Sequence, residues 1–109
     1  MSIHAAIYEA ANGRTPSLLP VLAKYVVMTR QARGCINVDF LLATLNTHMF
    51  LVYEKWDSEQ SRAAHYASEL VAQSAAGMSP YLAGSPTMIQ FESISAYDEG
   101  GLAPYEAEA

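Results

Sequence analysis

Three residues near the middle of the chain can move a proton and bind an aromatic ring. Glu54 and Trp56 lie two residues apart, and His65 follows Trp56 by nine residues. A histidine has an unperturbed pKa of about 6.5, so His65 can accept a proton near neutral pH with little tuning. A phenol, with a pKa of about 10, must lose its proton before its ring gives an electron to O₂. His65 is therefore the candidate general base for such a step.

Each of these side chains also has a structural interpretation. His65 has a second interpretation as a half-buried residue that only packs against its neighbours. Trp56 is either a pocket wall that stacks on an aromatic ligand or an anchor in the core or at an interface. Glu54 stands among apolar neighbours and needs a partner, such as a Lys or Arg across a subunit interface. Asn37 and Tyr8 are further candidates for polar contacts with a ligand.

A strand that runs into a helix must bring these residues together. Side chains of a strand alternate between two faces, so residues 48–56 are expected to place one set on a single face: Phe50, Val52, Glu54 and Trp56. Asp57 or Ser58 then caps a helix over 58–67 that carries His65. We expect any small-molecule site to lie beside this strand-to-helix corner.

Two segments before this corner are periodic. Residues 3–11 alternate as a strand that ends at Asn12-Gly13. The following helix is expected from about Ser17 to residue 33, because a proline at position 20 is harmless only within the first turn. Gly34 is its expected stop.

The segments on either side of the corner complete the pattern. Residues 36–45 form an apolar strand, and Asn46-Thr47 turns it back as a hairpin. A helical pattern continues from the second helix toward Gly77, and the last strand is expected over 87–97. Residues 98–109 form an acidic tail without periodicity, expected to be frayed or to lie across a partner subunit.

The element order is therefore βαββαβ, the α+β ferredoxin-like arrangement, formed by residues 1–97. Its helices cover one face of an antiparallel sheet. The other face carries apolar residues, and a second copy of the sheet is the simplest cover. Composition favours the same conclusion, because only 16% of residues are charged and 51% are hydrophobic. We expect a homodimer.

Composition argues against several other classes of protein. The net charge is −5 and the six Lys and Arg residues are scattered, so no nucleic-acid partner is expected. Cys35 is alone, which excludes an intrachain disulfide, and no Cys/His cluster has zinc spacing. The N-terminus does not resemble a signal peptide, and no apolar run is long enough to span a bilayer. We expect a cytoplasmic protein without a membrane partner.

The motifs resemble those of the antibiotic biosynthesis monooxygenase family. The resemblance runs over residues 3–97 and is carried by Gly34-Cys35, by Tyr53-Glu54-Lys55-Trp56 and by His65. It implies a dimeric α/β barrel built from two ferredoxin-like sheets. Several members oxidise phenols or hydroquinones with O₂ and no cofactor. Others degrade haem, handle autoinducer-like metabolites or have no assigned activity.

The sequence departs from the family pattern in three places. Asn12-Gly13-Arg14 stands where the family often has Pro-Gly-Lys or Arg, and Val38 stands where an aromatic residue is common. The haem-degrading branch has a Trp at the position of His65 and a His at the position of Ala75. The resemblance therefore does not favour haem degradation.

Two functional hypotheses follow. In the first, the protein is a cofactor-independent monooxygenase of an aromatic or quinol-like molecule, in which His65 is the base and Trp56 and Asn37 orient the ring. In the second, it is a non-catalytic dimer that binds a small metabolite or assists a pathway. An apolar pocket suits both, so the sequence does not separate them.

Overall fold

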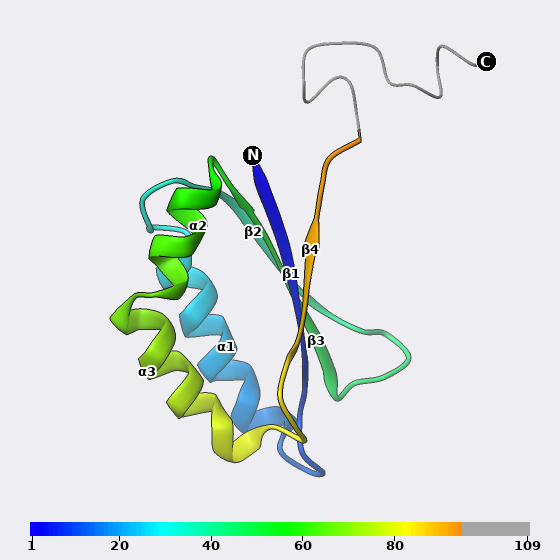
Figure 1. The fold of residues 1–109 in the computed structure, drawn as a ribbon. Helices are drawn as coiled ribbons and strands as arrows, with labels where there is room; N and C mark the ends of the chain where they lie inside the picture. Colours follow the sequence, from blue (N-terminus) through cyan, green and yellow to red (C-terminus); the bar gives the residue numbers. More distant parts are fainter. Residues whose placement is uncertain (95–109) are drawn as a thin grey trace, which may run out of the picture.

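The strands and helices follow one another in the expected order. The protein is seen in a computed structural model, which describes residues 1–94 (Figure 1). Its strands are β1 (Ser2–Glu9), β2 (Cys35–Leu42), β3 (Met49–Trp56) and β4 (Thr87–Phe91). Its helices are α1 (Thr15–Thr29), α2 (Glu59–Tyr66) and α3 (Glu69–Met78), followed by the single 3₁₀ turn η1 (Ser79–Tyr81).

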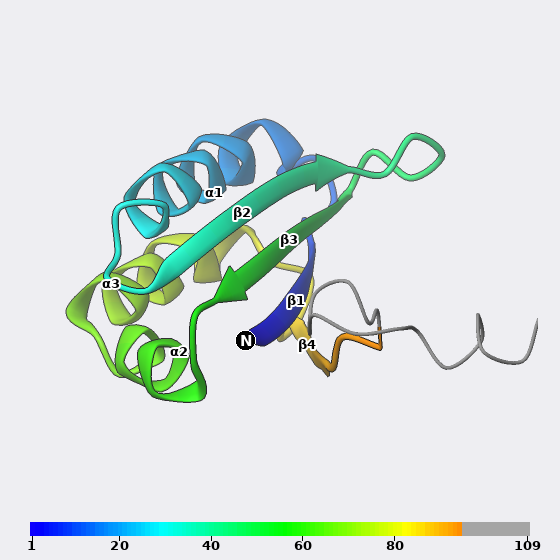
Figure 2. The same ribbon diagram turned by 90° about the horizontal axis from the view of Figure 1, so that it is seen from above.

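The four strands form one antiparallel sheet in the order β2-β3-β1-β4. This is the ferredoxin-like topology, which confirms the expected fold class. All three α-helices lie on the same face of the sheet (Figure 1), and the hairpin loop between β2 and β3 extends beyond them at one end (Figure 2). The β3–α2 corner therefore lies at the end of the sheet away from that loop.

Alternation along β3 sets which side chains meet the helices. Alternate residues of this strand are at most 1% exposed, and they are the predicted set: Phe50, Val52, Glu54 and Trp56. They lie opposite the apolar side of α1, whose buried residues include Leu18, Leu22, Tyr25 and Val26. The period-two prediction for β3 is confirmed.

Several predicted boundaries were wrong by a few residues. α1 begins at Thr15, not near Ser17, and Pro20 lies inside it. Pro16 and Pro20 are both exposed, so water can bind the carbonyl that lacks an N–H partner. α1 ends at Thr29, and turns occupy the residues up to Gly34.

The second helical region consists of two helices. Ser58 caps α2 and Ser68 caps α3, each through its side-chain oxygen, which accepts from the backbone N–H three residues later. β4 ends at Phe91, because within residues 1–94 it pairs with β1 alone and that ladder stops where Phe91 pairs with Ile3. The predicted tail, 98–109, lies outside the described residues.

The face of the sheet opposite the helices is apolar, as expected. Its exposed hydrophobic side chains include Leu41 at 51%, Ile89 at 38% and Phe91 at 46%. A depression of about 420 Å³ on this side is lined by six residues: Ile7, Leu41, Leu42, Ala43, Met49 and Leu51. Within residues 1–94, no helix is long and apolar enough to cross a membrane.

Candidate functional site

Glu54 is a fully buried carboxylate that accepts three hydrogen bonds. The Tyr25 hydroxyl donates to its Oε2 at 2.9 Å, the Trp56 indole N–H donates to its Oε1 at 2.9 Å, and the Tyr66 hydroxyl donates to its Oε1 at 3.1 Å. Such donors satisfy a buried carboxylate. The partner of Glu54 is thus a set of neutral donors within one protomer, and the expected Lys or Arg across an interface was wrong.

His65 joins this cluster through Tyr25. Its Nε2 lies 2.9 Å from Tyr25 Oη. Its ring packs on Trp56 with a centroid separation of 4.6 Å and contacts Tyr66 edge-on at 5.2 Å. His65 is only 5% exposed, so the imidazole is held on several sides. We call these five residues, Tyr25, Glu54, Trp56, His65 and Tyr66, the buried network.

Burial sets the protonation of the buried network. Burial lowers the pKa of His65 below its ordinary value, and the Glu54 carboxylate opposes part of that shift. Burial, then the charge of Glu54, raises the pKa of Tyr25 far above its ordinary range. The same two causes raise the pKa of Tyr66. His65 is therefore neutral at neutral pH, and both tyrosines keep their protons.

The β3–α2 corner positions His65. Ser58 caps α2 by accepting from the Ser61 N–H at 3.1 Å. Gly34 packs directly against this corner, where its carbonyl accepts from the Asp57 N–H at 2.8 Å. Its φ is +83°, and a Cβ at this position would collide with the side chains of Ser61 and Asp57. Glycine is required there, because it alone fits the conformation and the space.

A surface pocket of about 420 Å³ adjoins this corner. It lies between the end of α1, the turn that follows, and helices α2 and α3. Its lining residues are Met28, Gln31, Ala32, Arg33, Ser61, Ala64, His65, Ser68 and Leu70. We call it the His65 pocket. Its lining combines apolar residues, among them Met28 and Leu70, with polar residues that include His65.

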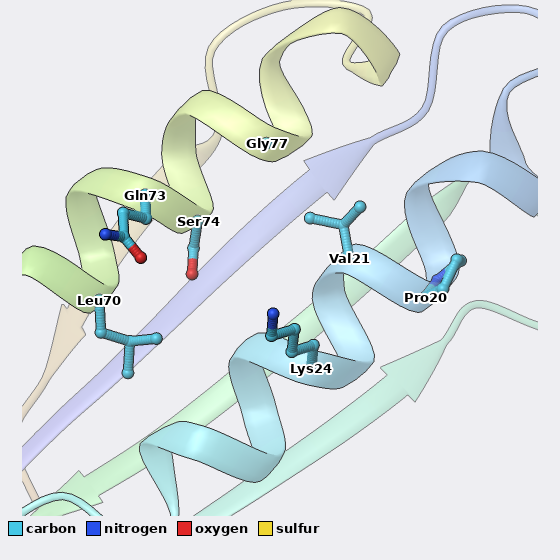
Figure 3. A pocket seen from close by; sticks show the side chains of 7 residues that line it. All are labelled: Pro20, Val21, Lys24, Leu70, Gln73, Ser74 and Gly77. Atoms are coloured by element: carbon cyan, nitrogen blue, oxygen red, sulfur yellow. The ribbon is translucent and has the colours of Figure 1, made fainter.

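A second groove lies between α1 and α3. It measures about 330 Å³, and the side chains of Lys24 and Ser74 extend into the gap between the helices (Figure 3). No imidazole or carboxylate lines it. This groove lacks a group that could act as a base near neutral pH.

The structure brings some predicted site residues together and separates others. Trp56 and His65 are in contact, as expected for one corner. Tyr8 is 5% exposed and belongs to the hydrophobic core cluster. Asn37 lies on the sheet face away from the helices, where its amide donates to Asp39 at 3.1 Å. Direct contacts of Trp56, Tyr8 and Asn37 with a ligand remain predictions.

Three residues in or beside the buried network were not recognised as candidates in the sequence. Tyr25 belongs to the apolar stripe of α1 and resembles a packing residue until its hydroxyl is seen on Glu54. Tyr66 directly follows His65, which is its only signal. His4 is 7% exposed, packs on Tyr66 at 5.0 Å, and neither of its ring nitrogens has a hydrogen-bond partner. In the part of the chain that the structure describes, no three His, Cys, Asp or Glu side chains gather as a metal site.

Comparisons with solved structures agree on the fold. A crystal structure of an antibiotic biosynthesis monooxygenase superposes with a TM-score of 0.80 at 18% identity, covering 86% of this chain and 99% of that one. A Pseudomonas aeruginosa protein gives 0.78 at 22%, covering 84% and 92%. A Mycobacterium tuberculosis protein gives 0.78 at 15%, covering 84% and 93%. At these identities, the likeness shows the fold.

The family itself is shown by a sequence model. No functionally curated protein matches the chain significantly. The model of the antibiotic biosynthesis monooxygenase family matches residues 1–77, which is more than half of the chain and includes every member of the buried network. The protein therefore belongs to the antibiotic biosynthesis monooxygenase family.

Proposed function

We propose that this protein is a cofactor-independent monooxygenase that oxidises an aromatic or quinol-like molecule with O₂, and that His65 is its general base. The observation that carries the proposal is that His65 belongs both to the buried network and to the lining of a pocket. One side of the imidazole is fixed through Tyr25 to Glu54, and His65 is also one of the residues that line a pocket. Family membership supports the reaction class.

The chemistry begins with a phenol that carries a hydrogen para to its hydroxyl group, bound in the His65 pocket. His65 removes the hydroxyl proton, and the phenolate transfers one electron to O₂. The resulting superoxide combines with the para carbon of the ring, and the proton held by His65 passes to the new peroxide. Loss of the para hydrogen as H⁺ and of the outer oxygen as OH⁻ gives a quinone and water. One O₂ is thus divided between product and water, and no further reductant is required.

The walls of the pocket suit such a substrate. Met28, Ala64 and Leu70 offer apolar surface for a ring, and the neighbouring polar residues can bind its substituents. Exclusion of water from an apolar site strengthens the electrostatic effect of a nearby base. Trp56 is fully buried and packs on His65, so it supports the base from behind.

We also propose that two copies pair through the apolar sheet face. Leu41 lies on this face and is 51% exposed, whereas Leu19 is 45% exposed on α1. Leu41→Asp should yield a monomer by light scattering, because it buries a charge in the interface. Leu19→Asp, a matched change on the helical side, should remain dimeric. A wild-type monomer at micromolar concentration would refute this pairing.

A cytoplasmic location stays a prediction.

Oxygen consumption tests the reaction. The protein is incubated with a panel of hydroquinones and anthrone-like phenols, with and without O₂, and O₂ uptake is followed. Wild type should consume O₂ above background, and His65→Gln should lose about 10²–10⁴-fold in rate, the usual contribution of a general base. His48→Gln is the matched control, because His48 is exposed in the β2–β3 loop. Equal rates for the two variants would remove His65 from the mechanism.

The same panel of phenols tests the alternative hypothesis, that the protein is a non-catalytic dimer that binds a small metabolite. If phenols bind at the His65 pocket and no O₂ is consumed, the protein is a metabolite-binding member of the family. Binding is read by calorimetry under anaerobic conditions, so it is measured independently of turnover.

A further inference from the structure

We propose that Tyr25 and Glu54 act as positioning residues that hold His65 with its proton on Nε2, so that Nδ1 is the nitrogen that accepts the substrate proton. This inference rests on the proposed function for the role of Nδ1. The tautomer itself can be observed without any reaction.

The tautomer follows from counting protons along the buried network. The Tyr25 hydroxyl has one hydrogen and lies 2.9 Å from both Glu54 Oε2 and His65 Nε2. An ionised carboxylate can only accept, so the Tyr25 hydrogen goes to Glu54. The Tyr25 oxygen is then free to accept, and His65 Nε2 must donate to it. A neutral imidazole has a single N–H, so its lone pair lies on Nδ1.

Glu54 also accepts hydrogen bonds from two further groups. The Trp56 indole can only donate, and it lies 2.9 Å from Oε1. The Tyr66 hydroxyl donates to the same oxygen. Three donors thus converge on a fully buried carboxylate. This arrangement satisfies a charged group that has no ion-pair partner among the described residues.

This arrangement has a consequence for the reaction. When Nδ1 takes a proton, Nε2–H still donates to Tyr25 and Tyr25 still donates to Glu54. No hydrogen bond needs to reverse, and the carboxylate offsets the new positive charge. Such preorganisation is a common source of catalytic rate. His65 is also one of the residues that line the pocket, so the base lies beside a surface that a ligand can contact.

His4 provides an internal comparison. It is as buried as His65, but neither of its ring nitrogens has a hydrogen-bond partner. Nothing in the described structure selects its tautomer. The geometry therefore separates two buried histidines, one with a fixed tautomer and one without.

Long-range ¹H–¹⁵N NMR on histidine-labelled protein tests the inference. Wild type should show His65 with Nε2 protonated. Glu54→Gln should reverse the tautomer. The Gln oxygen is needed by Trp56 and Tyr66, so its NH₂ group faces Tyr25, and Tyr25 must then donate to His65 Nε2. Tyr25→Phe should give a mixture of tautomers. Tyr81→Phe is the matched control and should leave the His65 signal unchanged.

Kinetics with an oxidisable phenol test the role of the tautomer. Tyr25→Phe should lower kcat by about 10–100-fold, part of the full contribution of a general base, while KM changes by less than about twofold. If Tyr25 had a purely structural role, Tyr25→Phe would change the stability of the protein and leave the His65 tautomer and the ratio of kcat to KM unaffected. Circular dichroism checks that each variant folds. Glu54→Gln keeps the size of the side chain, so the test survives if Tyr25→Phe does not fold.

Two results would overturn the assignment of the His65 tautomer. One is a wild-type His65 with its proton on Nδ1. The other is an unchanged tautomer in both Glu54→Gln and Tyr25→Phe. Absence of O₂ uptake with a correct tautomer would instead refute the proposed reaction, and an anaerobic phenol that fails to shift the Nδ1 resonance would refute the role of Nδ1.

Discussion

Gly34 supports a quantitative prediction, because both its conformation and its surroundings exclude a side chain. Its φ of +83° lies in the left-handed region. That region costs an L-residue about 1–2 kcal/mol. A Cβ on Gly34 would lie 2.7 Å from Asp57 Oδ1 and would collide with Ser61 as well. Gly34→Ala should therefore destabilise the corner from which α2 presents His65.

A substitution at Gly13 allows the conformational cost of Gly34→Ala to be separated from its steric cost. The φ of Gly13 is +75°, but beyond its two chain neighbours no residue has an atom within 4 Å of a Cβ built there. Gly13→Ala should lose only the conformational term, about 1–2 kcal/mol. Gly34→Ala should lose a further ~1–3 kcal/mol, the usual cost of overpacking. The predicted quantity is the difference in the free energy of unfolding between Gly34→Ala and Gly13→Ala. Each kcal/mol of this difference corresponds to about 4 °C in Tm for a domain of this size.

Urea denaturation followed by circular dichroism measures both variants, at equal protein concentration because dimerisation would affect stability. Gly34→Ala should also cost less in a Ser61→Gly background, since one of the two colliding side chains is then gone. Equal losses for Gly34→Ala and Gly13→Ala would refute the steric reasoning. So would an unchanged loss in the Ser61→Gly background.

Three further predictions concern the helix and its network. Tyr66→Phe removes a donor from buried Glu54 and should cost about 1–3 kcal/mol in the free energy of unfolding, measured by urea denaturation. Ser58→Ala should cost about 1 kcal/mol by the same assay, because it removes the side-chain cap of α2. Burial lowers the pKa of both His4 and His65, so the unfolded chain binds protons more readily than the folded one. Stability should be full above about pH 6.5 and fall as the pH drops below it; a flat profile between neutral and mildly acidic pH would contradict this.

Sequence patterns predicted the architecture well because they depend on local rules. Alternation along β3 assigned Glu54 and Trp56 to one buried face, since strand side chains repeat every two residues. The start of α1 was predicted too late because Pro20 was expected only within the first turn of a helix. Proline is tolerated further inside α1, since the carbonyl that loses its N–H partner faces water. Ser68 divides the second helical region, and its capping role was not distinguishable from an exposed helical serine.

The buried network depends on packing, which local rules do not describe. Tyr25 and Glu54 are 29 residues apart, and Tyr25 and His65 are 40 apart. Their contact arises only once α1 lies across β3. The sequence thus predicted the base, His65, but gave the wrong partner for Glu54. Asn37 was predicted to lie near His65, but its position on β2 places it on the face of the sheet that the helices do not cover.

The most direct measurement of the central claim is the ionisation of a bound phenol in the absence of O₂. A chromogenic phenol is added anaerobically at a pH below its own pKa, and the visible absorbance of its phenolate is recorded. Wild type should convert bound phenol to phenolate, and His65→Gln should bind it without that change, while His48→Gln behaves as wild type. Bound phenol that stays neutral in the wild type, or ionises equally in His65→Gln, would contradict the role of His65 as the base.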